Sequence, residues 1–251
     1  MNVIKKMQIK DYQIVVLGII IALGSICSTY ILSNAVVKFQ KLQNQTIRVT
    51  GSASQKVTSD RAALTIHVRT VKPSLKDGYN KLNADTKTTV DFLTANGIDS
   101  ANIDVSSINS YENYRRTPNG NTTNDIESYN VYRDIKIKSN DIANLTAVSK
   151  KVIELADKDI NISADNVEYF VSNLDDIKVK MVGEASKNAK ERAKSMIAGT
   201  NGQIGVMTSA KMGVFQIVPV DSTDVNDYGI NDTTSIEKKV VATVSATFTV
   251  K

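Results

Sequence analysis

Residues with special chemistry are scarce in this chain of 251 residues, which has no tryptophan, three prolines, one cysteine and one histidine. One cysteine cannot form a disulfide within the chain, and a zinc site would need ligands that the sequence nearly lacks. A Ser-His-Asp triad would have to use the single histidine, His67, and no G-x-S-x-G turn accompanies it. The inventory argues against familiar hydrolytic or zinc-dependent catalysis, and His67 is interpreted as a surface histidine of a strand.

Charge is also absent between Asp11 and Lys38, and the centre of that stretch, Ile14 to Leu32, is almost wholly apolar. At about 1.5 Å of rise per residue, a helix of this length covers the roughly 30 Å hydrocarbon core of a bilayer. The sequence therefore predicts one transmembrane helix followed by one large domain.

A cleaved secretory signal is the alternative, because Ser33–Ala35 resembles a small-residue cleavage site. The run is longer than the roughly 7 to 15 apolar residues of a typical signal, which favours an uncleaved anchor. Cys27 follows the bulky Ile26, where lipid attachment needs a small residue, so Cys27 is interpreted as an apolar membrane residue. Small residues share one face of the run and permit close helix contact, unless they reflect ordinary membrane-helix composition. They are Gly18, Ala22, Ser25 and Thr29.

The distribution of lysine favours a cytoplasmic N-terminus. Three lysines precede the run and two follow it closely, which fits the positive-inside tendency and places the large domain outside. Residues 1–41 hold five lysines and one aspartate, a net of +4, so only +1 of the whole chain's +5 belongs to the domain. We therefore expect the helix to contact membrane lipid and the domain to bind no nucleic acid.

The pattern after the run predicts an α+β (mixed α/β) domain of about seven strands and three helices. Alternation with period two indicates strands over 47–53, 62–71, 103–114, 127–138, 162–171, 204–218 and 240–250, the sixth with a bend near Gly213. Helical periodicity indicates helices over 74–96, 141–157 and 174–200. The last helix has an alanine-rich stripe that permits close packing, with Val182, Ala185, Ala189, Ala193 and Met196 as its buried residues.

Two further patterns carry weak signals for ligand binding. Gly199–Gly205 is rich in glycine but follows a helix instead of opening one, so it is interpreted as a helix-ending turn and not as a phosphate loop. The acidic loop 219–237 offers carboxylates without the alternating spacing of a calcium loop, at Asp221, Asp224, Asp227 and Asp232. No catalytic residue, cofactor-binding residue or metal ligand is predicted.

Short motifs spread along the domain resemble, in the same order, those of the SIMPL domain family of bacterial periplasmic and cell-surface proteins. They are Ile47–Gly51 (IRVTG), Ser59–Leu64 (SDRAAL), Asn96–Ile98 with Ile103–Ser107, Tyr129–Val131 and the alanine-spaced helix around Glu184–Ala193. The usual proline before Asp60 is Ser59 here, and the helix ends in Met196-Ile197. The resemblance implies two small lobes and a tendency to form ring-like or channel-like oligomers, with no established enzymatic activity and no general ligand.

These observations predict a short cytoplasmic head (1–11), a transmembrane anchor (12–37), a stalk (38–45) and a SIMPL-like extracytoplasmic domain (46–251) on a bacterial cytoplasmic membrane. The leading hypothesis is a non-enzymatic, membrane-anchored assembly protein that forms homo-oligomers and serves envelope integrity or stress tolerance. One alternative is a binding module for a glycan, a peptide or an envelope protein, through the polar hairpin loop or the acidic loop. A hydrolase with an unrecognised carboxylate pair is the third hypothesis.

Overall fold

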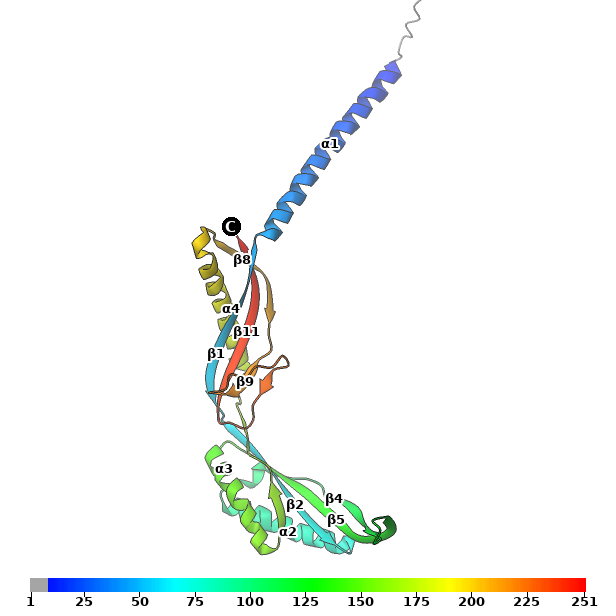
Figure 1. Ribbon diagram of the computed structural model, residues 1–251, viewed down its shortest axis with the longest axis vertical. Coiled ribbons are helices and arrows are strands. Elements are labelled where there is room, and N and C mark those ends of the chain that lie inside the picture. The colour runs from blue at the N-terminus through cyan, green and yellow to red at the C-terminus, as the bar shows by residue number, and fades with distance from the viewer. Residues whose placement is uncertain (1–8) are drawn as a thin grey trace, which may run out of the picture. The chain divides into compact units, whose positions relative to one another are not determined.

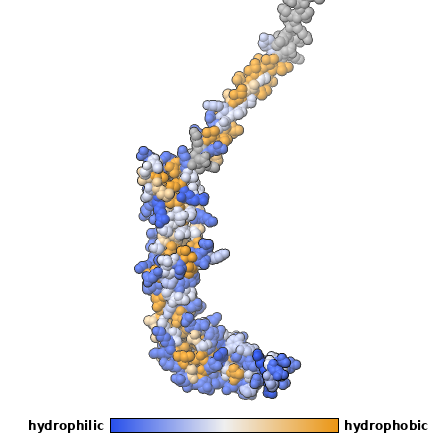
Figure 2. All heavy atoms as spheres, in the orientation of Figure 1, coloured by the Kyte–Doolittle hydropathy of each residue, from blue (hydrophilic) through white to orange (hydrophobic). Residues whose placement is uncertain are grey.

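The computed structural model describes residues 9–251, so residues 1–8 of the predicted cytoplasmic head lie outside the described part. Helix α1 (Ile9–Asn44) is continuous and contains a long apolar segment, Tyr12–Gln40. Within residues 9–251 it is the single helix long and apolar enough to cross a membrane, and its apolar side chains are exposed (Figure 2). The predicted N-terminal apolar helix is confirmed. Most of the predicted stalk is also helical, because residues 38–45 include no glycine or proline that would end the helix.

Two hydroxyl groups of α1, those of Ser25 and Thr29, are satisfied inside the helix itself. Ser25 Oγ donates a hydrogen bond to the carbonyl oxygen of Ile21 at 3.0 Å, and Thr29 Oγ1 donates to that of Ser25 at 2.8 Å. A hydroxyl without a partner is costly in hydrocarbon, so these bonds make the polar positions compatible with a lipid environment.

The chain folds into two compact units, and each unit is built from segments that are not continuous in the sequence. Unit 1 comprises the chain up to Ser52, Glu184–Gly213 and Thr243–Lys251, and unit 2 comprises Ala53–Gly183 and Val214–Ala242. The fold is mixed α+β, with four α-helices and two sheets in the described residues.

Unit 2 contains a six-stranded antiparallel sheet with helices on one face (Figure 1). The strand order is β3 (Ile103–Val105), β5 (Thr122–Ser139), β2 (Arg61–Lys72) and β6 (Asn161–Ala164), with β4 (Asn109–Arg116) also paired to β5 and β7 (Glu168–Phe170) to β2. The helical segments are α2 (Leu75–Ala95), α3 (Ile142–Lys151) and the 3-10 helices η1 (Ser100–Asn102) and η2 (Val152–Lys158). Alternate residues of β2, such as Leu64, Ile66 and Val68, pack against α2 and α3, which leaves the other face of the sheet open to solvent.

A second sheet has the order β1 (Thr46–Thr58), β11 (Glu237–Val250), β9 (Gln216–Pro219) and β10 (Ile230–Asn231), with β8 (Ile204–Met212) also paired to β11. In unit 1, α4 (Leu174–Ile197) lies almost against the backbone of β1. A Cβ atom on Gly51 would be 2.2 Å from the carbonyl oxygen of Ala185 and 2.3 Å from the backbone nitrogen of Ala189. The predicted close packing of the alanine-rich helix is confirmed, since Ala185, Ala189 and Ala193 are fully buried.

The residues predicted at the two ends of the buried stripe of α4 are wrong. Met196 is 62% exposed and Val182 is only half-buried, whereas Met181 and Ile197 are buried. The buried row continues in steps of four residues, because an i+4 ridge of the helix follows the sheet surface. The structure also has eleven strands in its described part where about seven are predicted, because turns and bends interrupt several long segments, including the one expected near Gly213.

Candidate functional site

The open face of the unit 2 sheet carries the polar side chains that alternate with its core. Along β2 these are Thr65 and His67, with the small Ala63 before them, and the residues of β5 opposite Ala63, Thr65 and His67 are Lys138, Lys136 and Asp134. The pairing register therefore sets which side chains can act together on this face, and the alternation of the strands directs them to solvent.

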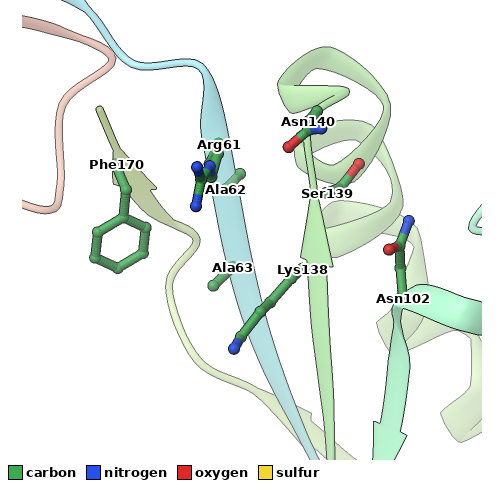
Figure 3. Close-up of a pocket in the computed structure, with 8 residues that line it drawn as sticks. All are labelled: Arg61, Ala62, Ala63, Asn102, Lys138, Ser139, Asn140 and Phe170. Atoms are coloured by element: carbon green, nitrogen blue, oxygen red, sulfur yellow. The ribbon is translucent and has the colours of Figure 1, made fainter. Parts of the chain in front are cut away.

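A hollow of about 510 Å³ lies at the end of this face where β2 begins and β5 ends (Figure 3). We call it the basic pocket. Its lining consists of Arg61, Ala62, Ala63, Asn102, Lys138, Ser139, Asn140 and Phe170. The lining contains two cationic groups, two amides and one aromatic ring, and it contains no carboxylate.

Backbone pairing brings these residues together from four places in the sequence. Ala63 lies opposite Lys138 on β5, and Arg61 lies opposite Phe170 on β7. In Figure 3 the side chain of Lys138 extends from β5 towards β2, and Arg61 lies between Phe170 and Asn140. Asn102 comes from η1, directly before β3.

Asp60, the residue directly before β2, is hydrogen-bonded to β7 and the segment that follows it. Its backbone N–H donates to the carbonyl oxygen of Phe170 at 3.0 Å, and its carboxylate accepts hydrogen bonds from the backbone N–H (2.7 Å) and the hydroxyl of Ser172. The hydroxyl of Ser172 is the main cause that lowers the pKa of Asp60, although the slight burial of the carboxyl opposes it. The Arg61 charge also favours the ionised carboxylate.

Within residues 9–251, neither cation of the basic pocket, Arg61 or Lys138, forms a salt bridge, although the charge of Arg61 acts on the nearby carboxylate of Asp60. Arginine recognises carboxylates and phosphates through a planar pair of N–H donors, and lysine adds a point charge. The arrangement can therefore bind an anionic group, with the amides of Asn102 and Asn140 available for its neighbouring polar atoms.

A second hollow, of about 420 Å³, lies on the other side of Ala63. We call it the acidic pocket. It is lined by Ala63, Thr65, Asp165, Asn166, Val167, Glu168, Thr233 and Thr234. Its lining contains two carboxylates and no cationic residue, whereas the lining of the basic pocket contains two cationic residues and no carboxylate.

His67 lies between two carboxylates on the same face. Its Nδ1 is 2.7 Å from Oδ1 of Asp134, and its Nε2 is 3.2 Å from Oδ1 of Asp165. The hydrogen bond with Asp134 raises the pKa of His67, partial burial lowers it, and Asp165 raises it again, so that the net shift is upward. Because both ring nitrogens face carboxylates, neither is available to take a proton from a hydroxyl nucleophile. His67 forms an ion-paired bridge, and it does not have the geometry of a general base.

The position of Asp134 is itself fixed from a neighbouring segment. The backbone N–H of Asp134 donates to Ser106 Oγ at 2.9 Å, and the backbone N–H of Ser106 donates to the carbonyl oxygen of Asp134 at 2.9 Å. The interpretation of His67 as an outward-facing strand residue is confirmed, because its side chain is 39% exposed. Its two acidic partners were missed, since the pairing register of β2 with β5 is not visible in the sequence.

The acidic loop does not gather its aspartates around one point. Asp232 pairs with Lys238, whose Nζ lies 3.6 Å from Asp232 Oδ2 and donates to the carbonyl oxygen of the same residue. Burial acts to raise the pKa of Asp232, but hydrogen bonds from Ser235 and Thr234 and the charge of Lys238 outweigh it, so the pKa falls to about 2. In the described residues no group of three or more His, Cys, Asp or Glu side chains could hold a metal ion.

The other glycine and cysteine positions lie outside these pockets. The turn from Gly199 to Gly205 follows α4 through the 3-10 helix η3 (Ala198–Thr200) and leads into β8, so it presents no helix N-terminus. Cys27 is exposed on α1. The polar hairpin loop connects β4 and β5, at a distance along β5 from the residues that line the basic pocket.

Residues 47–250 match SIMPL, a family described as a protein of unknown function (DUF541). The chain belongs to the SIMPL family. No curated protein matches it.

The structure gives physical reasons for two of the SIMPL-like motifs. Gly51 ends the first motif at the place where α4 leaves no room for a side chain. In the second motif, Asp60 accepts a hydrogen bond from the backbone of Ser172. Its neighbours Arg61 and Ala63 line the basic pocket, and Leu64 lies in the core. This SIMPL-like motif therefore also builds one wall of the basic pocket.

Proposed function

We propose that this SIMPL protein is a non-enzymatic, membrane-anchored protein on the outer face of a bacterial cytoplasmic membrane, where it forms homo-oligomers that serve envelope integrity or stress tolerance. The apolar α1 supports the anchoring, and the lysines around it support a cytoplasmic N-terminus. The SIMPL membership supports an extracytoplasmic location for the domain.

The observation that carries the assembly proposal is the edge formed by β8. Within the described residues β8 pairs only with β11, so its other edge has backbone N–H and C=O groups without a strand partner. Three large apolar side chains on this strand, Val206, Met207 and Met212, are between 50% and 71% exposed. Natural proteins blunt exposed sheet edges with charge, proline or bulges, and β8 itself has one lysine, Lys211, and an irregular register near its start. Its exposed apolar side chains still offer a surface to a strand of another chain.

Crosslinking of the full-length protein in native membranes tests the assembly. We expect a ladder of crosslinked species from the unaltered protein and a loss of that ladder from the Val206→Lys/Met212→Lys variant, because lysine on the edge opposes strand addition. Val225→Lys is the matched control, since Val225 is 80% exposed in a loop outside β8. A protein that stays strictly monomeric in the membrane contradicts the proposal.

The envelope role needs a separate measurement in cells. Cells that lack the protein should lose viability under detergent or osmotic stress, and the unaltered gene should restore it while the Val206→Lys/Met212→Lys variant does not. Equal restoration by that variant would separate the envelope role from assembly.

Binding of an extracytoplasmic ligand is the second candidate function, and the basic pocket favours it. An open hollow with two unpaired cations, an aromatic wall and free amides has the composition of a site for a small polar ligand. Its location differs from the hairpin loop and the acidic loop that the sequence favours for binding.

A further inference from the structure

The basic pocket and the acidic pocket meet at one small residue. Ala63 lines both hollows, and in the sheet it lies between Lys138 on β5 and Glu168 on β7. A larger side chain at position 63 would rise between the two hollows on the open face. The methyl group of Ala63 leaves the surface between them low enough for one ligand to lie across both.

The charges on the two sides of Ala63 are opposite and do not neutralise each other. Arg61 and Lys138 lie on one side and Asp165 and Glu168 on the other, and no salt bridge joins the two pairs. Asp165 faces His67 Nε2 at 3.2 Å, whereas Glu168 accepts only a long hydrogen bond of 3.4 Å from Thr233 Oγ1. Glu168 is therefore the carboxylate most available to an incoming cation.

The other charged groups near the site are already in contact with the protein or lie farther along the strands. Asp60 is bound to Ser172, and Asp134 is bound to His67. Lys136 is opposite Thr65, two residues before Lys138 on β5 and farther from the basic pocket. The open charges nearest to Ala63 are thus Lys138 and Arg61 on one side and Glu168 on the other.

Strand spacing sets the scale of the site. Neighbouring strands are about 4.8 Å apart, so the backbones of β5 and β7, which flank β2, are separated by about 10 Å, and the side chain of Lys138 extends from β5 towards β2 across part of this span (Figure 3). An extended peptide of two or three residues, at roughly 3.4 Å per residue, has about this length or less, and its two ends carry an ammonium and a carboxylate. The length and the signs of the charges fit such a molecule.

We propose that the basic and acidic pockets together bind a short peptide with both termini free, its carboxylate at Arg61 and Lys138 and its ammonium at Glu168 and Asp165. The hydroxyls of Thr233 and Thr234 and the amides of Asn102 and Asn140 are placed to contact its polar backbone. Phe170 supplies an apolar wall beside the carboxylate end (Figure 3). This inference rests on the second candidate function, ligand binding, and adds the chemical class of the ligand.

The test is a calorimetric titration of the full-length protein in lipid nanodiscs with three probes: trialanine, N-acetyl-trialanine and trialanine amide. We expect trialanine to bind, and removal of either terminal charge to weaken binding about tenfold, the range of one charge-assisted hydrogen bond. Glu168→Gln should reduce the difference between trialanine and its acetylated form, because the partner of the ammonium is gone. Lys138→Gln should reduce the difference between trialanine and its amide.

Matched variants define the outcomes. Lys136→Gln removes a cation from the same face of the same strand and should leave trialanine binding unchanged, whereas Ala63→Leu should abolish it while the melting temperature stays close to that of the unaltered protein. Equal binding of trialanine and N-acetyl-trialanine would overturn the two-ended site and leave ligand binding in the basic pocket standing. Absence of binding by all three probes to the folded protein would overturn the proposal itself.

Discussion

In unit 2, large aliphatic side chains separate the sheet from its helices, whereas in unit 1 helix α4 lies directly on the backbone of β1. The unit 2 core includes Leu64, Ile66 and Leu82, all at most 2% exposed. The unit 1 cluster is built around Ala189, Ala193 and Phe248. The packing of unit 2 thus depends on the volume of its core side chains, whereas the close contact in unit 1 depends on small residues, Gly51 on β1 and alanines on α4.

The largest expected effect comes from a buried charge in unit 2. Asp232→Asn leaves Lys238, a side chain only 2% exposed, without its counter-charge, and should lower the free energy of unfolding by about 3 to 5 kcal/mol. Urea denaturation of the full-length protein in detergent micelles measures this loss. Asp224→Asn, an exposed position in the same loop, is the control and should change stability by less than about 0.5 kcal/mol.

The same pair gives a dependence on pH at the acidic end. The pKa of Asp232 in the folded protein is about 2, below its unfolded value. Its stabilising contribution is therefore fully present above about pH 4 and is lost as pH falls towards 2. The Asp232→Asn variant should lack this part of the acid transition, and an unchanged acid transition would contradict the assignment.

The second largest effect tests the dependence of unit 2 on side-chain volume. Ile66→Ala removes a fully buried side chain at the centre of β2 and should destabilise the protein by about 2 to 5 kcal/mol, through lost burial and the cavity left behind. Hydrogen exchange should show the loss of protection in β2 and β5. Val71→Ala, on the same strand but 48% exposed, should cost far less.

The opposite substitution tests unit 1. Gly51→Ala adds one methyl group where it would be 2.2 Å from a backbone atom of α4, so the helix must move, at a cost of about 1 to 3 kcal/mol. Gly183→Ala is the matched control on α4 itself, because nothing lies within 4 Å of the added Cβ. It should stabilise the helix by about 0.5 to 1 kcal/mol. Equal and small effects of both substitutions would remove the distinction between the units.

The smallest effect concerns His67 on the open face of unit 2. Its pKa is raised in the folded state, so its contribution to stability is full below about pH 6.5 and is lost as pH rises through the folded value. The groups are well exposed, and solvent screening keeps the contribution below about 1 kcal/mol. Because His67 is the only histidine, its NMR Hε1 signal reports the pKa directly. Asp134→Asn should lower that pKa, and an unchanged titration would contradict the ion-paired bridge.

Local patterns in the sequence predict most of the elements but not their pairing. The alternation of β2 correctly separates Leu64, Ile66 and Val68 from Thr65 and His67, because side chains of a strand alternate between its faces. The alanines of α4 predict its close packing, since small residues permit it. The loop aspartates, by contrast, do not reveal that Asp232 pairs with Lys238.

The candidate site could not be predicted because it depends on register. Lys138 and Glu168 lie far from Ala63 in the sequence and become its neighbours only through the pairing of β2 with β5 and β7. A shift of one residue in either pairing would turn the partner side chains to the buried face. The motif around Asp60 identifies the family, yet the sequence contains no signal that its arginine and alanine form a wall of a pocket.

The junction between α1 and β1 has a consequence for proteolysis. Only Gln45 separates the last residue of α1, Asn44, from the first of β1, Thr46, and its carbonyl oxygen accepts a hydrogen bond from the N–H of Val250 at 2.8 Å. Proteases cut preferentially in exposed segments whose backbone is not hydrogen-bonded, and no such segment lies between α1 and β1. A protease must therefore first unwind the end of the helix or detach the edge strand of the sheet before it can separate α1 from the domain.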